Sequence, residues 1–553
     1  MKTNTKTILL FIMSFALIGL ISFTYAYFSN DIVNNNVKDQ VVETGTLSLR
    51  YVDGPEINMQ NIKPGSTITK TIYVANTGTL DAKYNLVWQE LNNTITNDEM
   101  VIEAKCTRMN GQTEEVDGTC EGLTETPIKK VRIKENISIE PSIVHKYDIT
   151  ITFKEMNKDQ NYNQNKKFTG VLGVKEYKAP EVINCTFDGE LVQGAEYVNG
   201  QYTYRYMQEG TRYSNGLAWS NITSDGWGVQ LTNKTSTEPV TGQVCSYIND
   251  KPVVSMSYMF ENSKATSIDV DTFDTSNVTN MFAMFLGSQA TTLDLNSFDT
   301  SKVTSMLNMF NGCHSTIIDV SNFDTSNVTD MFGMFSDSET TIIDVSNFNT
   351  SNVTDMGYIF LNSKATTLDV SNFDTSNVTG MRGMFLGSKA VTLDLSNFNT
   401  SKVINMNEMF ANSEVTTIDV SNFDTSNVIY MSGMFGESKA TTINGLLKFN
   451  TSNVTGMDYM FNRCKVDYLD LSSFDTSNVT KMTYMFNECS NLKAIYVSNK
   501  FNVDKVTKSS NMFTDSMKLV GGAGTVYDSS KTDKTYARVD GGTSSPGYFT
   551  LVN

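Results

Sequence analysis

Histidine is almost absent from this sequence, in which only His145 and His314 occur among 553 residues. Two histidines cannot build a multi-histidine metal site or a HExxH protease helix, so these zinc-enzyme classes are excluded. Neither histidine has the supporting signature that a Ser or Cys catalytic triad requires. Basic charge is also scarce, because the formal net charge is −17 and the isoelectric point is about 4.7. Nucleic acids and anionic membranes attract basic surfaces, so we expect neither as a partner.

Long apolar runs are scarce as well. The run from Ile8 to Ile21 has fourteen residues, whereas a membrane-spanning helix needs about 20. Lysines precede this run and the small-residue motif "TYA" follows it, which predicts a signal peptide over residues 1–26, cleaved between Ala26 and Tyr27. The alternative is an uncleaved membrane anchor. We therefore expect a secreted protein, extracellular or at the cell surface, with no transmembrane span in the mature chain.

Cysteine is sparse but informative, since seven cysteines in an exported chain favour disulfides. Cys106 and Cys120 flank the turn sequence "RMNGQ" and could close a hairpin. Cys185 and Cys245 lie on either side of a polar, aromatic stretch and could link its ends by a disulfide. Both pairs are predicted disulfides.

Residues 27–177 have the pattern of β-strands. In "YDITITF", Tyr147, Ile149, Ile151 and Phe153 alternate with polar residues, which places them on one face of a strand. Turn signals, such as Pro-Gly at residues 64–65, separate several such runs. Many short strands with turns between them indicate a β-sandwich.

The same segment resembles the TasA and camelysin family of secreted matrix proteins in "AYFSND", "ETGTLSL" and "KPGSTITKTIYVANTGTLDAKY". The resemblance implies a jelly-roll-like sandwich that can build extracellular fibres when a neighbouring subunit adds a strand. An exposed sheet edge can do this, although an ordinary protected edge is the alternative. Camelysin-like proteins are also labelled metallo-endopeptidases, but His145 is the only histidine in this segment.

Residues 178–250 predict a small β-rich adaptor. The stretch "QGAEYVNGQYTYRYMQEG" has an Asn-Gly turn between aromatic alternating runs, which is typical of a hairpin. Trp219 and Trp227 lie in this adaptor. Clustered aromatic residues can bind sugars, but in a small domain they more often form the core.

The remainder is dominated by a repeat whose phenylalanines recur every 25 residues: Phe273, Phe298, Phe323, Phe348, Phe373, Phe398 and Phe423. Phe449 follows after 26 residues, so that coil should bulge. This period is typical of a solenoid of leucine-rich-repeat length. We predict about ten coils over residues 251–518 and a C-terminal cap over 519–553.

Each repeat predicts one short helix and one short strand. In "SNVTNMFAMF" the apolar residues share one helical face: Val278, Met281, Met284 and Phe285. In "ATTLDL", Leu293 and Leu295 lie on one side of a strand. A single coil cannot bury its own apolar face, so coils must stack. The methionine column is predicted to be core, the alternative being an adaptable binding surface.

Two further columns follow from the period. Cys464 and Cys489 stand one coil apart, about 4.8 Å, where parallel Cβ directions favour buried thiols over a disulfide. The outward strand positions form a column of acidic residues that is a candidate ligand face: Asp269, Asp294, Asp319, Asp344, Asp369, Asp394, Asp419 and Asp470. Stacked like charges repel, so this column could bind cationic protein segments or Ca²⁺. Alternatively, each Asp bonds its own turn or is neutralised by nearby lysines.

The repeats also resemble the BspA-type leucine-rich repeats of bacterial surface proteins, through "SNFDTSNVTDMFGMF" and "LDLSSFDTSNVTKMTYMFNECSNL". That resemblance implies adhesion to host matrix proteins, host cells or other bacteria. We therefore expect a mainly β, non-enzymatic adhesin or matrix protein with no cofactor. The alternatives are a biofilm fibre subunit that polymerises through the N-terminal domain and, more remotely, a camelysin-like protease.

Overall fold

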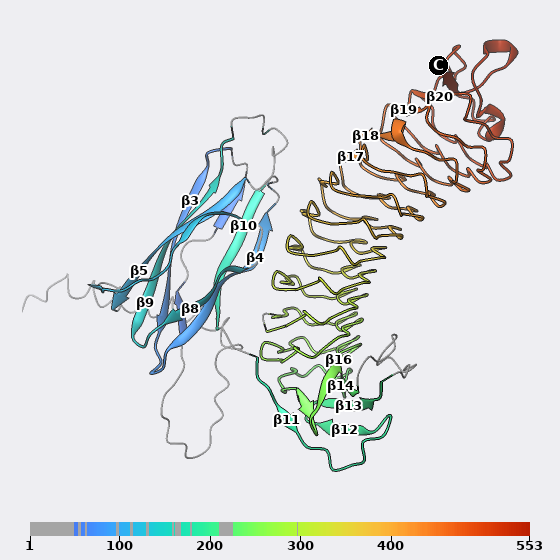
Figure 1. Cartoon of the computed structure of the whole chain (residues 1–553). Helices are drawn as coiled ribbons and strands as arrows, with labels where there is room; N and C mark the ends of the chain where they lie inside the picture. Colours follow the sequence, from blue (N-terminus) through green and yellow to red (C-terminus); the bar gives the residue numbers. More distant parts are fainter. Residues whose placement is uncertain are drawn as a thin grey trace, which may run out of the picture. The chain divides into compact units, whose positions relative to one another are not determined.

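A computed structural model describes residues 49–52, 57–60, 63–93, 95, 99–110, 114–128, 132–156, 160, 167–176, 180–209, 225–295 and 297–552 (Figure 1). The predicted signal peptide, its cleavage site at Ala26 and Tyr27, and Trp219 lie outside these residues. The described chain is mainly β-structure and contains no α-helix. Its helical segments are short 3-10 turns: η2 (Leu446–Lys448), η3 (Lys534–Tyr536) and η4 (Gly542–Ser544).

Two antiparallel sheets form the N-terminal domain. The first has the order β1 (Leu49–Val52), β3 (Thr67–Asn76), β9 (Ile143–Phe153), β5 (Met100–Asn110) and β6 (Glu114–Glu115), with β7 (Leu123–Pro127) also paired to β5. The second has the order β2 (Ile57–Gln60), β10 (Lys167–Glu176), β4 (Ala82–Asn93) and β8 (Arg132–Ile139). Side chains from both sheets share one core, so the domain is a β-sandwich.

The alternation in β9 shows why this segment folds as a strand. Tyr147, Ile149, Ile151 and Phe153 are buried, and the residues between them are only partly so. At one end of the strand the amide of Gly65 donates to the carbonyl of Phe153 at 2.7 Å. The strand and turn predicted from the sequence are therefore present.

The adaptor is a sheet of the order β11 (Asn184–Cys185), β15 (Tyr247–Ile248), β16 (Lys251–Ser255), β14 (Gly226–Leu231), β13 (Tyr202–Met207) and β12 (Glu196–Asn199). The predicted Asn-Gly turn joins β12 to β13. Trp227 is fully buried in the core, where its Nε1 donates to the carbonyl of Ile248 at 3.2 Å. This core continues from the adaptor into the repeats and on to Phe549.

The repeats form a stack of coils, here called the coil stack (residues 255–516), in which equivalent residues lie one above another (Figure 1). The methionine column is fully buried, as predicted, from Met281 through Met306 to Met482. Equivalent phenylalanine rings stack, with Phe285 and Phe310 separated by 5.6 Å between centroids at an interplanar angle of 7°. Regular strands occur towards the C-terminal end: β17 (Thr417–Asp419), β18 (Thr442–Asn444), β19 (Tyr468–Leu471), β20 (Ala494–Val497) and β21 (Phe549–Leu551).

The short helix predicted in each repeat is wrong. Backbone amides of this segment bond to the next coil instead of to residue i−4: Ala283 donates to Leu307 and Phe285 to Met309, each at 2.9 Å. Ala283 and Gly287 have left-handed backbone conformations, with φ of 51° and 62°. Left-handed residues cannot continue a right-handed helix, so the apolar spacing is met by successive turns.

The extra residue before Phe449 is accommodated by a local change of backbone. Gly445 has φ of 95°, and the turn η2 follows it directly. A Cβ on Gly445 would lie 2.4 Å from the amide nitrogen of Ser421 in the preceding coil. The insertion therefore requires glycine for both conformation and space.

Candidate functional site

The predicted acidic column lies on the coil stack, but its carboxylates are used by the fold. Seven of the eight accept a hydrogen bond at Oδ1 from the backbone amide two residues later, at 2.9–3.2 Å: Asp269, Asp319, Asp344, Asp369, Asp394, Asp419 and Asp470. Asp294 belongs to the same column, and the residue two positions after it lies outside the described part of the chain. The Ser421 hydroxyl and amide hold the pKa of the Asp419 carboxyl below its usual range. These seven carboxylates thus each accept a bond within their own turn, which is the alternative to a ligand-binding role that the sequence also allowed.

One of the lysines near the column has another partner. Lys389 pairs with Glu414 in the next coil at 3.4 Å, with both side chains well exposed. Such an exposed pair contributes little to stability. At Asp419 the local Ser421 groups lower the carboxyl pKa most, and Lys448 adds a smaller contribution.

The residues of the repeated motif "DTSN" have structural roles. Asp274 accepts from the amide of Ser276 at 3.0 Å, which closes a turn. The hydroxyl of the buried Thr275 donates to the carbonyl of Asp299 in the next coil at 3.0 Å and accepts from its amide at 2.8 Å. The Asn side chain reaches back, as Asn327 does to the carbonyl of Ser301 at 2.7 Å. Repetition of this motif is therefore a requirement of stacking.

One row of side chains changes from coil to coil, and we call it the variable stripe. Its members follow the first methionine of a coil by one or two positions and are half-buried or exposed: Tyr258, Phe282, Phe332, Tyr358, Arg382, Glu408, Tyr459 and Tyr484. Tyr459 and Tyr484 stack with ring centroids 4.9 Å apart. Arg382 lies 5.3 Å above the Tyr358 ring and pairs with Glu408 at 3.3 Å. The sequence reasoning missed this row, whose signal is non-repeating residues inside a repeating frame.

Both predicted disulfides are present. Cys106 and Cys120 are joined with their Cα atoms 5.6 Å apart, and Cys185 and Cys245 with theirs 5.8 Å apart. The three repeat cysteines are free and buried: Cys313, Cys464 and Cys489. Burial raises the pKa of the Cys313 thiol to about 11, and the hydrogen bond to Cys489 raises the pKa of Cys464. The Cys313 and Cys464 thiols are consequently protonated and poor nucleophiles at neutral pH.

His145 lies inside the sandwich, where its side chain is only 2% exposed. Its Nδ1 is 2.8 Å from the Tyr84 hydroxyl, which in turn lies 2.9 Å from the Tyr147 hydroxyl. Burial lowers the pKa of His145 to about 4. In the described residues, the one group of three metal-ligating side chains is His145 with Cys106 and Cys120. Their disulfide removes both thiolates from coordination.

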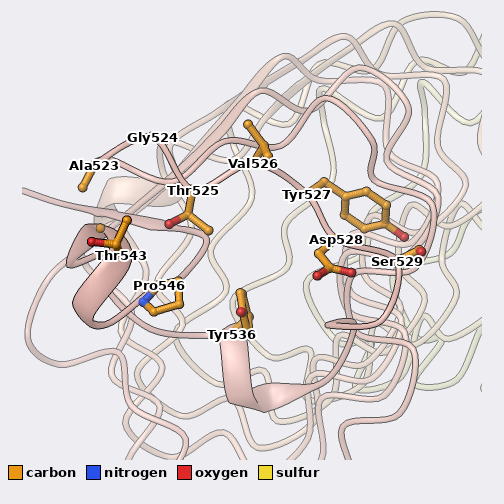
Figure 2. Close-up of a pocket in the computed structure, with 11 residues that line it drawn as sticks. Ala523, Gly524, Thr525, Val526, Tyr527, Asp528, Ser529, Tyr536, Thr543 and Pro546 are labelled. Carbon is orange, nitrogen blue, oxygen red and sulfur yellow. The ribbon is translucent and has the colours of Figure 1, made fainter.

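An open pocket of about 650 Å³ lies in the C-terminal cap (Figure 2). Its walls include Tyr527, Tyr536 and Pro546, with the carboxylate of Asp528 at one side. No histidine lines it, so it offers no imidazole base to activate a serine. The pocket can accommodate a ligand, and its lining is mixed apolar, aromatic and polar.

These features define a class of acidic protein in which a disulfide-bonded β-sandwich is followed in the chain by a stack of repeated coils. The chain belongs to the family described as "Mycoplasma protein of unknown function, DUF285", whose model matches residues 236–342, 334–445 and 414–526. Residues 5–100 are similar to the family described as "Camelysin metallo-endopeptidase". No curated protein matches the chain significantly. Among the described residues, no helix has the length and apolar character needed to cross a membrane.

The camelysin similarity raises the question of a protease without deciding it. The matched segment ends at residue 100, before Cys106, Cys120 and His145. The resemblance to camelysin predicted from the sequence is therefore confirmed for the N-terminal region. The BspA resemblance is not among these family matches and stays a prediction.

Proposed function

We propose that the protein is a secreted bacterial surface adhesin or extracellular-matrix protein that binds host matrix proteins or other cells through its coil stack. We also infer that its coils are BspA-type leucine-rich repeats, because their period and apolar positions fit that class. The observation that carries the proposal is the variable stripe, which presents tyrosine, phenylalanine and arginine on a regular backbone. Tyrosine and arginine are enriched among residues that dominate protein-binding energy.

The acidic composition supports the same proposal. The formal charge of −17 favours partners with cationic segments, and it raises association rates for such partners at low salt. The Asp column itself contributes less than expected, because its carboxylates already accept local amides. Recognition is therefore assigned to the variable stripe, with the column adding long-range attraction.

Binding to immobilised fibronectin and collagen tests the proposal. The double variant Tyr459→Ala/Tyr484→Ala removes the stacked pair of the stripe, and we expect at least about tenfold weaker binding. Tyr468→Ala is the matched control, since Tyr468 is 55% exposed on the strand β19, outside the stripe. Equal losses in both variants, or none in the double variant, would contradict the assignment.

A biofilm fibre subunit is the second candidate. Strand β8 lies at an edge of its sheet among the described strands and has eight residues, enough to pair with a strand of another chain. Light scattering of the chain starting at Tyr27 and of a truncated chain starting at Lys178 distinguishes the two candidates. Assembly of the longer chain without matrix binding by either favours the fibre; binding by both as monomers favours adhesion.

A protease is the third candidate, supported by the camelysin similarity. Casein cleavage that is abolished by a chelator and by His145→Ala would favour it. Cleavage that survives both would be assigned to a contaminant.

A further inference from the structure

Two cysteines and one histidine converge at the inner face of the sandwich. In the pairing of β5 with β9, Cys106 is opposite Tyr147 and Arg108 is opposite His145. Opposed residues point to the same face, so Cys106 and His145 are diagonal neighbours on it. Cys120 approaches from the loop between β6 and β7. One ligand atom from each of Cys106, Cys120 and His145 lies within 4.8 Å of the other two.

The loop that carries Cys120 is held close to β5 by a glycine. A Cβ on Gly122 would lie 2.2 Å from the carbonyl oxygen of Ala104, so no larger residue fits without a backbone shift. Lys134 also donates to the carbonyl of Gly122 at 3.0 Å. Cys120 is consequently kept beside Cys106 by contacts other than the disulfide.

The His145 ring is already oriented by a hydrogen bond with a neighbouring tyrosine. Its Nδ1 is engaged by the Tyr84 hydroxyl at 2.8 Å, and Tyr84 is itself bonded to Tyr147. Nε2 is therefore the ring atom that remains for coordination. A hydrogen bond at the other ring nitrogen is the usual way in which proteins fix a metal-ligating imidazole.

We propose that reduction of the Cys106–Cys120 disulfide converts this cluster into a Zn²⁺ site with two thiolates and one imidazole, leaving the fourth position for solvent. A dithiol reductant supplies two electrons and two protons, giving two thiols and the oxidised cyclic disulfide; Zn²⁺ then displaces the two thiol protons. Zn–S bonds of about 2.3 Å in a tetrahedral site separate two sulfurs by about 3.8 Å, so the Cys106 and Cys120 sulfurs, which are joined here, have to move apart after reduction in order to bind one ion. Disulfide and metal therefore exclude each other.

The local charges permit a cation here. Arg108 lies beside His145, but its guanidinium is paired with Glu140 at 3.0 Å. Two thiolates add two negative charges that offset Zn²⁺. The other cysteine pairs lack a third ligand: in the described residues, neither Cys185–Cys245 nor Cys464–Cys489 belongs to a three-residue metal-ligating group. This inference is independent of the proposed adhesion.

Cobalt spectroscopy on the full chain tests the proposal. The protein is reduced with dithiothreitol, desalted under nitrogen and titrated with Co²⁺. We expect about one equivalent to give thiolate-to-cobalt charge-transfer and tetrahedral d–d bands, which Zn²⁺ removes and which the oxidised protein lacks. Cys120→Ser should weaken binding about tenfold or more and reduce the charge-transfer band, whereas Cys464→Ser is the matched control and should not. Bands that persist in Cys120→Ser, or that disappear in Cys464→Ser, would overturn the assignment.

A second measurement needs no variant, so it is valid even if a substitution impairs folding. Reduced wild-type protein is alkylated with iodoacetamide with and without Zn²⁺, and modified cysteines are mapped by mass spectrometry. Zn²⁺ should slow alkylation of Cys106 and Cys120 at least about tenfold relative to Cys185 and Cys245. Equal rates at all four cysteines would refute the site.

Discussion

Thr375 provides a sharp test of the idea that the repeated motif is structural. Its side chain is fully buried, its hydroxyl donates to the carbonyl of Asn399 in the next coil at 2.9 Å, and it accepts from the amide of the same residue at 2.8 Å. Thr375→Val keeps the shape but removes both hydrogen bonds to the backbone of Asn399, an exposed residue whose N–H and C=O can still reach water. Each such bond contributes about 1 kcal/mol net, so we expect a loss of about 2 kcal/mol in the free energy of unfolding.

The matched control is Thr375→Ser, which keeps the hydroxyl and removes one methyl group, at a cost of about 1 kcal/mol. Urea unfolding followed by far-ultraviolet circular dichroism compares both variants with wild type. Tryptophan emission is unsuitable, since the three tryptophans are at positions 88, 219 and 227, outside the coils around Thr375. If Thr375→Val matched wild type, or if Thr375→Ser were destabilised as strongly, the threonine hydroxyl would not hold the coils together.

Three further outcomes follow from the structure. Gly445→Ala should destabilise the coil stack by at least about 1–2 kcal/mol, because φ is 95° and the new Cβ meets the backbone at Ser421; an unchanged urea midpoint would contradict this. The pKa of His145 is about 4 in the folded chain and 6.5 in the unfolded chain, so the unfolded chain binds the proton first as the pH falls. About 3 kcal/mol of stability that is present above pH 6.5 should therefore be lost as the pH falls to 4. The variant His145→Gln should abolish this pH dependence. Asp540 accepts hydrogen bonds from Ala523, Thr525 and Gly542, which hold its pKa at about 2; Asp540→Asn should therefore speed proteolysis within the C-terminal cap, whereas equal cleavage rates would show that these bonds are dispensable.

The sequence predicted the features that depend on period and burial. Met281 and Phe298 recur every 25 residues and are buried, because a stack can bury only positions that repeat in register. The alternation in β9 and the pairing of Cys106 with Cys120 were also predictable, since both depend on short-range patterns.

The helix in each repeat could not be distinguished from a series of turns by apolar spacing alone. Met281, Met284 and Phe285 are buried in either case, and the backbone direction decides the outcome. A usable signal was the residue six positions after the first methionine, which is Asn, Gly or Asp in most coils and has positive φ, as at Asn262 and Gly287. Those residue types tolerate the left-handed conformation that ends a helix.

The acidic column and the variable stripe differ in what repetition requires of them. A column of identical aspartates resembles a ligand-binding face, but Asp394 and Asp419 recur because every coil needs the same turn. The variable stripe contains the side chains that differ between coils. A repeat pattern is defined by the positions that stay the same, so it does not reveal these residues. Which partner it fits depends on the three-dimensional arrangement of unlike side chains, and no single repeat encodes that arrangement.

The coil-to-coil hydrogen bonds have a mechanical consequence. The amides of Ala283 and Phe285 in one coil, and their equivalents in the others, donate to the adjacent coil, so tension along the stack passes through these interfaces in series. Detaching one terminal coil frees 25 residues, which extend to about 85 Å, while the stack shortens by about 4.8 Å. Under load the protein would therefore lengthen in steps of about 80 Å and dissipate work at each step, a useful property in a tether exposed to flow.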